Sequence, residues 1–173
     1  FPKLVPPLPE AYLEKLTDKI YLSAVLVVLV LDRPLSPHYW TYVGDRDIPF
    51  LGIIEHTNFV PAAHYGGGHI VYLTNYLDRS DPLYQMSSEE LYRAYLPYLQ
   101  RINPAFDESW VTEYHYHKVD AAQPIVTRGY SERIPEHRTP IAGLYLANTT
   151  QIYPEDRGTN YSVRMGRQVA EMM

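Results

Sequence analysis

An uninterrupted apolar run near the start of the chain most limits the folds open to it. Residues 21–31 read YLSAVLVVLVL, an eleven-residue stretch that is rich in Val and Leu and carries no charge. Such a run, without polar alternation, predicts a strand that is buried on both faces. It falls far short of the roughly 20 residues that a membrane-spanning helix needs. We therefore expect a buried strand here and no membrane span in the chain.

The rest of the chain mixes strand and helix patterns without a repeat. Helix patterns cover residues 9–19, the stretch that begins at Ser87, and the C-terminal tail. Aromatic and β-branched residues predict further strands at 39–43, 50–55, 69–76, 109–119 and 143–149. This order of elements predicts an α+β fold, with one mixed or antiparallel sheet and helices on one face.

The clearest helix start lies at Ser87. Ser87 and Glu90 have the spacing of a capping box, in which each side chain bonds the backbone N–H of the other residue. Pro97 should kink this helix, unless the helix restarts there. The apolar stripe expected to face the core consists of Leu91, Tyr95, Leu96 and Leu99.

Composition excludes several classes of function. A net charge of −5 argues against binding to a nucleic-acid backbone, which favours a basic face. The chain has no cysteine, which rules out a disulfide framework or a thiolate site. With 17 tyrosines and 15 prolines, we expect aromatic-lined sheet surfaces joined by proline-stiffened loops. No secretory signal is visible, and we expect a cytoplasmic location.

The stretch EHTNFVPAAHYGGGH, which begins at Glu55, is the first that could carry chemistry. His and Glu are common zinc ligands, but Glu55 and His56 are adjacent and would face opposite sides of a strand. No recognised metal spacing is present, so we favour ordinary polar loop residues over a metal site. A further interpretation places Glu55, His56 and Asn58 where a strand meets a pocket for an organic ligand, and these are our candidate substrate-binding residues.

A second candidate lies in the strand predicted at 109–119. His115 and His117 are two positions apart and would share one face of that strand. Paired histidines on a strand can bind a metal ion, but no third ligand is visible. We favour an ordinary strand with one aromatic and one polar face, and we expect no metal site.

The third candidate is the C-terminal tail. Residues 157–160, Arg-Gly-Thr-Asn, form a polar loop before a helix pattern that places Val163, Gly166, Val169 and Ala170 on one side. We expect the helix to begin at residues 160–162, where Asn and Ser are good N-caps. A helix start offers unpaired N–H groups and the positive end of the helix dipole, which suit an electron-rich ligand.

The tail resembles the C-terminal flavin-contacting segment of FAD-dependent oxidoreductases of the amine oxidase and protoporphyrinogen oxidase type. Residues 143–148 stand where that family has a short strand, with Ala147-Asn148 in place of the usual Gly-Asp, and Ser162, Gly166 and Ala170 stand for its small helix face. Residues 40–77 resemble part of the substrate domain of the protoporphyrinogen-oxidase-like members.

The resemblance implies a cofactor, FAD, and an organic small-molecule substrate bound beside it. It also implies that residues 1–142 belong to a substrate-binding domain and that 143–173 form the closing flavin-contacting strand, loop and helix. No catalytic acid or base stands out. The residues that the resemblance places at the cofactor are Asn148, Arg157, Gly158, Thr159 and Asn160.

The other half of a dinucleotide site is missing from the sequence. No G-x-G-x-x-G stands between a strand and a helix, and the cluster Gly66-Gly67-Gly68 has the wrong spacing. We therefore expect a fragment whose Rossmann half lies in the N-terminal part of the same protein, and which alone neither holds FAD well nor acts as an enzyme. A non-catalytic small-molecule binding module and a protein-interaction domain remain open as alternatives.

Overall fold

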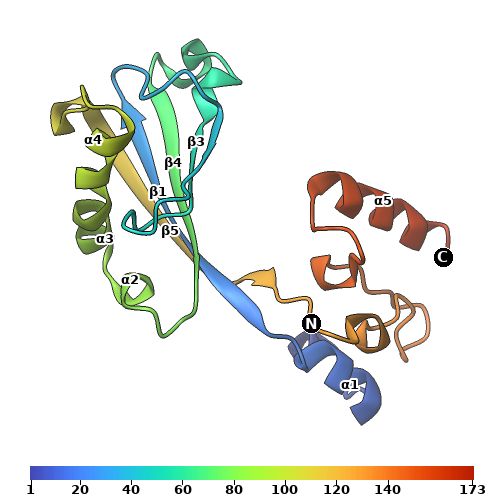
Figure 1. Ribbon diagram of the computed structural model, residues 1–173. Coiled ribbons are helices and arrows are strands. Elements are labelled where there is room, and N and C mark those ends of the chain that lie inside the picture. Colours follow the sequence, from blue (N-terminus) through green and yellow to red (C-terminus); the bar gives the residue numbers. More distant parts are fainter. The chain divides into compact units, whose positions relative to one another are not determined.

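The computed structural model describes residues 1–173, and these form two compact units (Figure 1). The first, which we name the sheet unit, is Tyr21–Gln123. The second, which we name the terminal unit, combines Phe1–Ile20 with Pro124–Met173. None of the helices in either unit has the length and hydrophobicity required to cross a membrane.

The sheet unit is built on a five-stranded sheet with the order β2-β3-β4-β1-β5. The pairs β1–β4, β3–β4 and β2–β3 are antiparallel. The hydroxyl of Thr112 donates to the carbonyl of Val30, and Ser23 donates to that of Asp120, so β5 also runs against β1. The strands are β1 (Tyr21–Leu31), β2 (Trp40–Tyr42), β3 (Gly52–Glu55), β4 (His69–Leu77) and β5 (Val111–Pro124). The predicted strand at 21–31 is confirmed at both ends, and the sheet is antiparallel.

Helices cover one face of this sheet, as predicted. Figure 1 shows α3 (Ser88–Tyr95) and α4 (Leu99–Ile102) on the same side of the strands, with the short α2 (Pro82–Gln85) near their end. Alternate side chains of β1 point to this side and are almost fully buried, and they form the main core with the helices. The predicted stripe Leu91, Tyr95, Leu96 and Leu99 is buried in that core.

The ends of α3 follow the chemistry of its sequence. Ser87 Oγ accepts the Glu90 N–H, and the Glu90 carboxylate accepts the Ser87 N–H at 2.8 Å, so the predicted capping box is confirmed. These bonds lower the pKa of Glu90, because the Ser87 N–H and hydroxyl stabilise its charged form. Proline lacks an N–H, and at Pro97 the α-helix gives way to a 3₁₀ turn, Leu96–Tyr98. The helix then restarts at Leu99, the second of the two alternatives.

The terminal unit joins the first 20 residues to the last 50. It holds α1 (Glu10–Thr17), α5 (Thr159–Ala170) and several 3₁₀ turns. The hydroxyl of Tyr12 donates to the carbonyl of Glu136 at 2.9 Å, which ties α1 to the later segment. A small second core consists of Ile152, Met165 and Val169. Residues 124–142 belong to the same compact unit as the tail. The division after residue 142 into substrate-binding and flavin-contacting parts stays a prediction.

The strand predicted at 143–149 is wrong. Only an isolated bridge joins Arg138 to Tyr145, and Gly143 adopts a left-handed turn conformation at φ 77°. Asn148 then caps a 3₁₀ helix, Thr149–Gln151, by accepting the Thr150 N–H. Asparagine side chains compete in this way with extended pairing, which explains why the apolar alternation here did not produce a strand.

The tail helix also differs in detail from the prediction. It begins at Thr159 with Gly158 as the N-cap residue, one position before the predicted range. Its buried side chains are Met165 and Val169, whereas Val163 is 61% exposed. A Cβ added at Gly166 would meet nothing within 4 Å. Apolar contact with residue 152 therefore decides the orientation of α5, and the small residues lie outside the contact.

Candidate functional site

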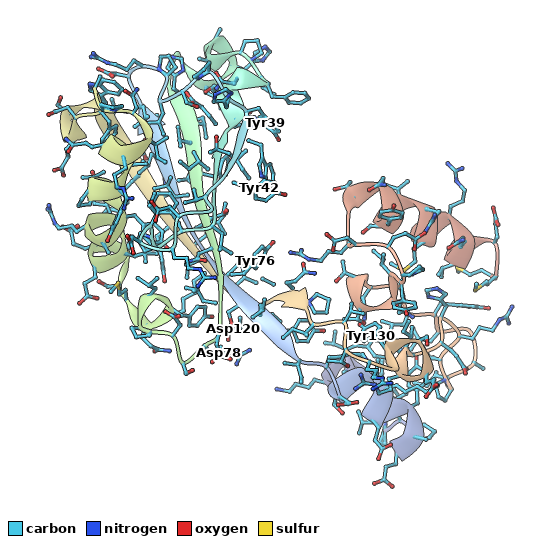
Figure 2. The ribbon with its side chains drawn as sticks, in the orientation of Figure 1. Tyr39, Tyr42, Tyr76, Asp78, Asp120 and Tyr130 are labelled. Carbon is cyan, nitrogen blue, oxygen red and sulfur yellow. The ribbon has the colours of Figure 1, made fainter.

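On the face of the sheet opposite the helices, none of the residues that β1, β2, β3 and β4 contribute is charged. The strand register aligns Trp40, Ile54, Tyr72 and Val28 in one row, and Tyr42, Gly52, Thr74 and Leu26 in the next. We name this surface the open face. Its members are Ala24, Leu26, Val28, Val30, Trp40, Tyr42, Gly52, Ile54, Ile70, Tyr72, Thr74 and Tyr76. Figure 2 shows Tyr42 and Tyr76 on the side away from α3 and α4.

Exposed aromatic rings gather along the β2 side of the open face. Tyr39 lies 5.4 Å from Phe59 between ring centroids, and Trp40 lies 5.6 Å from Tyr42. Tyr42 is 81% and Phe59 74% exposed. A contiguous exposed apolar surface on a folded protein usually marks a binding site, and aromatic rings with polar tips suit one.

Glu55, predicted at the substrate, lies under the loop that leads into β2. Its side chain is fully buried, and its two carboxylate oxygens accept the N–H groups of Leu35 and Ser36 at 2.8 and 2.7 Å. The Ser36 hydroxyl donates to the same carboxylate at 3.0 Å. A buried carboxylate is tolerated only when donors surround it in this way. In this structure Glu55 fixes the loop that presents the aromatic rings.

Asn58 also bonds the loop before β2. Its amide donates to the carbonyls of Ser36 and His38 at 2.9 and 3.0 Å. His56, which lies between Glu55 and Asn58 in sequence, is half-buried and contacts other groups. Its Nε2 lies 2.6 Å from the Tyr65 hydroxyl, and its ring lies edge-on to Tyr72 of the open face. Of the three predicted substrate residues, His56 is therefore the one placed against the open face.

The residues predicted at the cofactor lie in the terminal unit. No side chain caps α5, and its first turn has no acidic residue. The first N–H bonded inside the helix is that of Ser162, which donates to Gly158 O at 2.9 Å. The N–H groups of Thr159 and Asn160 thus have no partner in the protein. A Cβ on Gly158 would lie 2.7 Å from the Asn160 side-chain oxygen, so a side chain at this N-cap position would displace the Asn160 amide.

Asn148 and Arg157 are placed differently. The side-chain oxygen of Asn148 already accepts the N–H and the hydroxyl of Thr150, so it acts as a turn cap. The backbone N–H of Arg157 donates to the Asp156 carboxylate at 2.8 Å. The structure shows no hydrogen bond between Asn148 and residues 157–160. Gly158, Thr159 and Asn160 form one local site, and Asn148 stands apart from it in the hydrogen-bond pattern.

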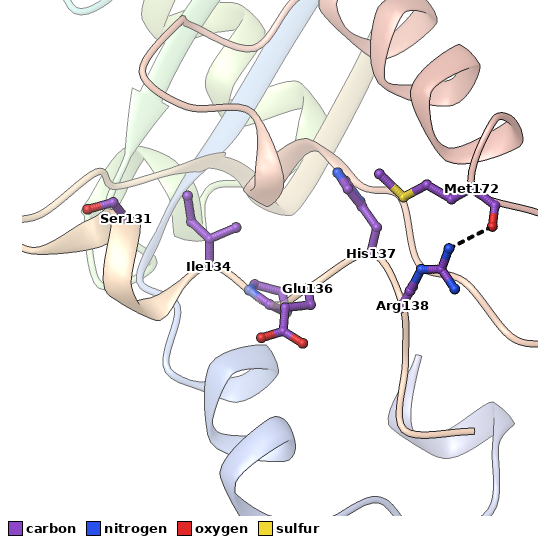
Figure 3. Close-up of a pocket in the computed structure, with 7 residues that line it drawn as sticks. Ser131, Ile134, Glu136, His137, Arg138 and Met172 are labelled. Atoms are coloured by element: carbon purple, nitrogen blue, oxygen red, sulfur yellow. Dashed lines mark hydrogen bonds between the residues drawn. The ribbon is translucent and has the colours of Figure 1, made fainter. Parts of the chain in front are cut away.

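Two cavities in the terminal unit lie beyond these residues. One, of about 230 Å³, lies between residues 151–155 and the side of α5 that carries Tyr161 and Arg164. The other, of about 500 Å³, lies near Met172, after the end of α5 (Figure 3). There Arg138 donates to the Met172 carbonyl at 3.0 Å. None of the predicted site residues lines either cavity.

The histidine pair of β5 does not meet a third metal ligand. His115 Nε2 lies 3.2 Å from the Glu113 carboxylate, and both side chains are at least half exposed. The structure contains no group of three His, Cys, Asp or Glu side chains arranged to hold a metal ion. The expectation that the protein binds no metal stays a prediction for chemical analysis.

Sequence reasoning missed Tyr65 and the extent of the open face. The alternation of aromatic residues in 39–43 and 69–76 was visible, but the register that aligns these strands was not. Tyr65, which contacts His56, lies in the 3₁₀ turn Ala62–Tyr65. No periodic pattern in the sequence predicts that turn.

Comparison with known proteins agrees with this architecture. The family model of the flavin containing amine oxidoreductases matches residues 1–172. No curated protein shows a significant match. A protein assigned as a protoporphyrinogen oxidase from Exiguobacterium sp. 255-15 superposes with a TM-score of 0.72 at 20% identity, over 99% of this chain and 39% of its own. An oxidoreductase from Methanosarcina mazei gives 0.63 at 19% identity, over 94% and 37%.

A reduced UDP-galactopyranose mutase is also similar, with a TM-score of 0.53 at 16% identity, over 66% of this chain and 25% of its own. At these identities the solved structures show the fold alone. The chain spans about two-fifths of the length of the first of them. The family match, in contrast, extends over nearly the whole chain, so this chain belongs to the family of flavin containing amine oxidoreductases.

Proposed function

We propose that the chain is the substrate-binding part of an FAD-dependent oxidoreductase, and that its open face forms one wall of the substrate site. The observation that carries this proposal is the absence of charge across four strands of an aromatic-rich sheet face. A ligand site is typically apolar with a few placed polar groups, and this face has that composition. The flavin, when bound, accepts the hydride, and the protein binds and orients the substrate.

The start of α5 supplies the second part of the proposal. The unpaired N–H groups of Thr159 and Asn160 fit an electron-rich edge or a phosphate of FAD, since a helix N-terminus favours such atoms. Gly158 keeps the approach to these groups free of a side chain. Arg157 adds positive charge beside them, and Asn148 stays in the proposal as a more distant contact. The remaining contacts to FAD come from a Rossmann half elsewhere in the same protein.

In this proposal the three predicted substrate residues have different roles. Glu55 and Asn58 hold the loop before β2 and thereby position the aromatic rings. His56 offers a polar group directly at the open face. We further propose a cytoplasmic location and a small organic molecule as the partner.

The test uses the complete flavoprotein and anaerobic flavin reduction, followed by absorbance. Protoporphyrinogen and primary amines serve as the panel of reductants, and at least one should bleach the flavin. Ile54→Lys places a charge on the open face and should slow that reduction about tenfold or more, because a lysine there must be desolvated when substrate binds. Leu4→Lys, at a site 85% exposed, is the matched control and should reduce as fast as the wild type.

Unchanged reduction in Ile54→Lys, with the flavin still bound, would remove the open face from the substrate site. A complete protein that binds no flavin would refute the assignment to flavin chemistry. A protein-interaction role for the aromatic rings would then be the better reading of the same surface.

A further inference from the structure

The imidazole of His56 lies near the surface, and two tyrosine rings pack against it. Its ring lies edge-on between two tyrosines, with centroid distances of 5.3 Å to Tyr65 and 6.2 Å to Tyr72. The turn that carries Tyr65 ends at Gly66 in the left-handed conformation, whose N–H donates to Ala62 O. Both neighbours of the imidazole are thus fixed by backbone structure.

The contact with Tyr65 also bears on which nitrogen of His56 carries the proton. Nε2 lies 2.6 Å from the Tyr65 hydroxyl. A phenol O–H is a stronger acid than the N–H of a neutral imidazole, and this difference favours the arrangement in which the tyrosine donates and Nε2 accepts. The proton of the neutral ring then resides on Nδ1, since the bond made by one ring nitrogen sets the state of the other.

Nδ1 has no partner in the protein. The imidazole ring lies beside Tyr72 of the open face, and Tyr72 pairs across the sheet with the apolar residue Ile54. A fixed donor beside an uncharged surface recognises a molecule with an apolar body and a hydrogen-bond acceptor. An ammonium group, which can only donate, would not satisfy it.

We infer that His56 is the specificity-determining residue of the open face, and that its Nδ1–H binds a carbonyl or carboxylate oxygen of the substrate, with Tyr65 as its positioning residue. This inference rests on the proposed function, because it names the group that the substrate must carry.

The first experiment measures the tautomer in the 173-residue chain without any ligand. Long-range ¹H–¹⁵N NMR at pH 8.5 should show His56 with its proton on Nδ1. Tyr65→Phe should shift the ring toward the Nε2–H form that free histidine prefers. Tyr42→Phe removes a hydroxyl from the same face without touching His56 and should change nothing. A wild-type ring protonated on Nε2 would overturn the inference.

The second experiment compares two probes with the same bicyclic body, 1-indanone, which has a carbonyl, and indane, which has none. Binding is followed by the shift of the Trp40 indole resonance. Indanone should bind the wild type more tightly by roughly 2- to 13-fold, the range expected for one hydrogen bond. His56→Phe should abolish this preference while indane still binds.

Equal affinities in the wild type, a preference that survives in His56→Phe, or failure of both probes to shift Trp40 would each overturn the inference. These outcomes are separate from the proposed function, which is decided by flavin reduction in the complete protein. A flavin that is reduced while the two probes bind equally would leave the open face as the substrate wall and remove His56 as its anchor.

Discussion

Replacing Glu55 by Gln tests whether a buried carboxylate holds the loop before β2. The fully buried side chain receives three hydrogen bonds, from two backbone N–H groups and the Ser36 hydroxyl. Hydrogen bonds to a charged group are worth roughly 1.5–3 kcal/mol each, and an unsatisfied buried donor costs roughly 1–3 kcal/mol. Gln keeps one acceptor oxygen but turns an NH₂ group toward a backbone N–H. We expect a loss of about 2–4 kcal/mol from the free energy of unfolding, a large part of the 5–15 kcal/mol typical of a domain.

Urea unfolding followed by tryptophan fluorescence measures this loss in the right part of the chain. Both tryptophans, Trp40 and Trp110, lie in the sheet unit, so the signal reports that unit. Glu113→Gln changes an exposed carboxylate of the same unit and should shift the unfolding free energy by less than about 0.5 kcal/mol. A Glu55→Gln variant as stable as Glu113→Gln would show that the buried bonds do not secure the loop.

Three further outcomes follow from the structure. Ser87→Ala removes the N-cap of α3 and should cost about 1 kcal/mol of unfolding free energy, measured by urea denaturation, whereas Ser87→Asn should cost far less. Burial raises the pKa of Tyr95 to about 12, so its stabilising effect is complete below its ordinary value of 10.0 and is lost as pH rises toward 12. Tyr95→Phe should therefore weaken the fall in stability between pH 10 and 12, and an unchanged alkaline profile would contradict the assignment. The purified 173-residue chain should be folded and colourless, and stoichiometric flavin absorbance would show that it holds the cofactor without a Rossmann half.

The sequence predicted the elements whose local signals agree with their packing. The run at 21–31 has ten apolar residues out of eleven and is rich in β-branched Val, which favours a buried strand, and β1 has those bounds. The capping box of Ser87 and Glu90 could likewise be predicted from the local sequence, since its hydrogen bonds close within one helical turn. Such features need no knowledge of distant residues.

The parts that could not be predicted depend on contacts between distant segments. Glu55 looked like a site residue because carboxylates at strand ends often are, yet its partners lie 19 and 20 positions earlier in the chain. The residues at 143–149 alternate like a strand, but Asn148 finds a closer backbone partner in Thr150. The orientation of α5 depends on its contact with Ile152, which the helix pattern alone does not contain.

The central claim, that the start of α5 meets the flavin, is tested most directly by FAD titration of Thr159→Pro in the complete apoprotein. Thr159 is the first residue of α5, a position where proline suits a helix, and Gly158 before it is already extended, at φ −159° and ψ 158°. The substitution therefore removes one N–H donor and leaves the helix intact. Loss of that bond, worth roughly 1–3 kcal/mol, predicts an FAD affinity about 5- to 150-fold weaker. Thr159→Ala keeps the donor and should bind FAD almost as tightly as the wild type. Equal affinities for Thr159→Pro and the wild type would contradict the account, and α5 would then serve only to pack the terminal unit.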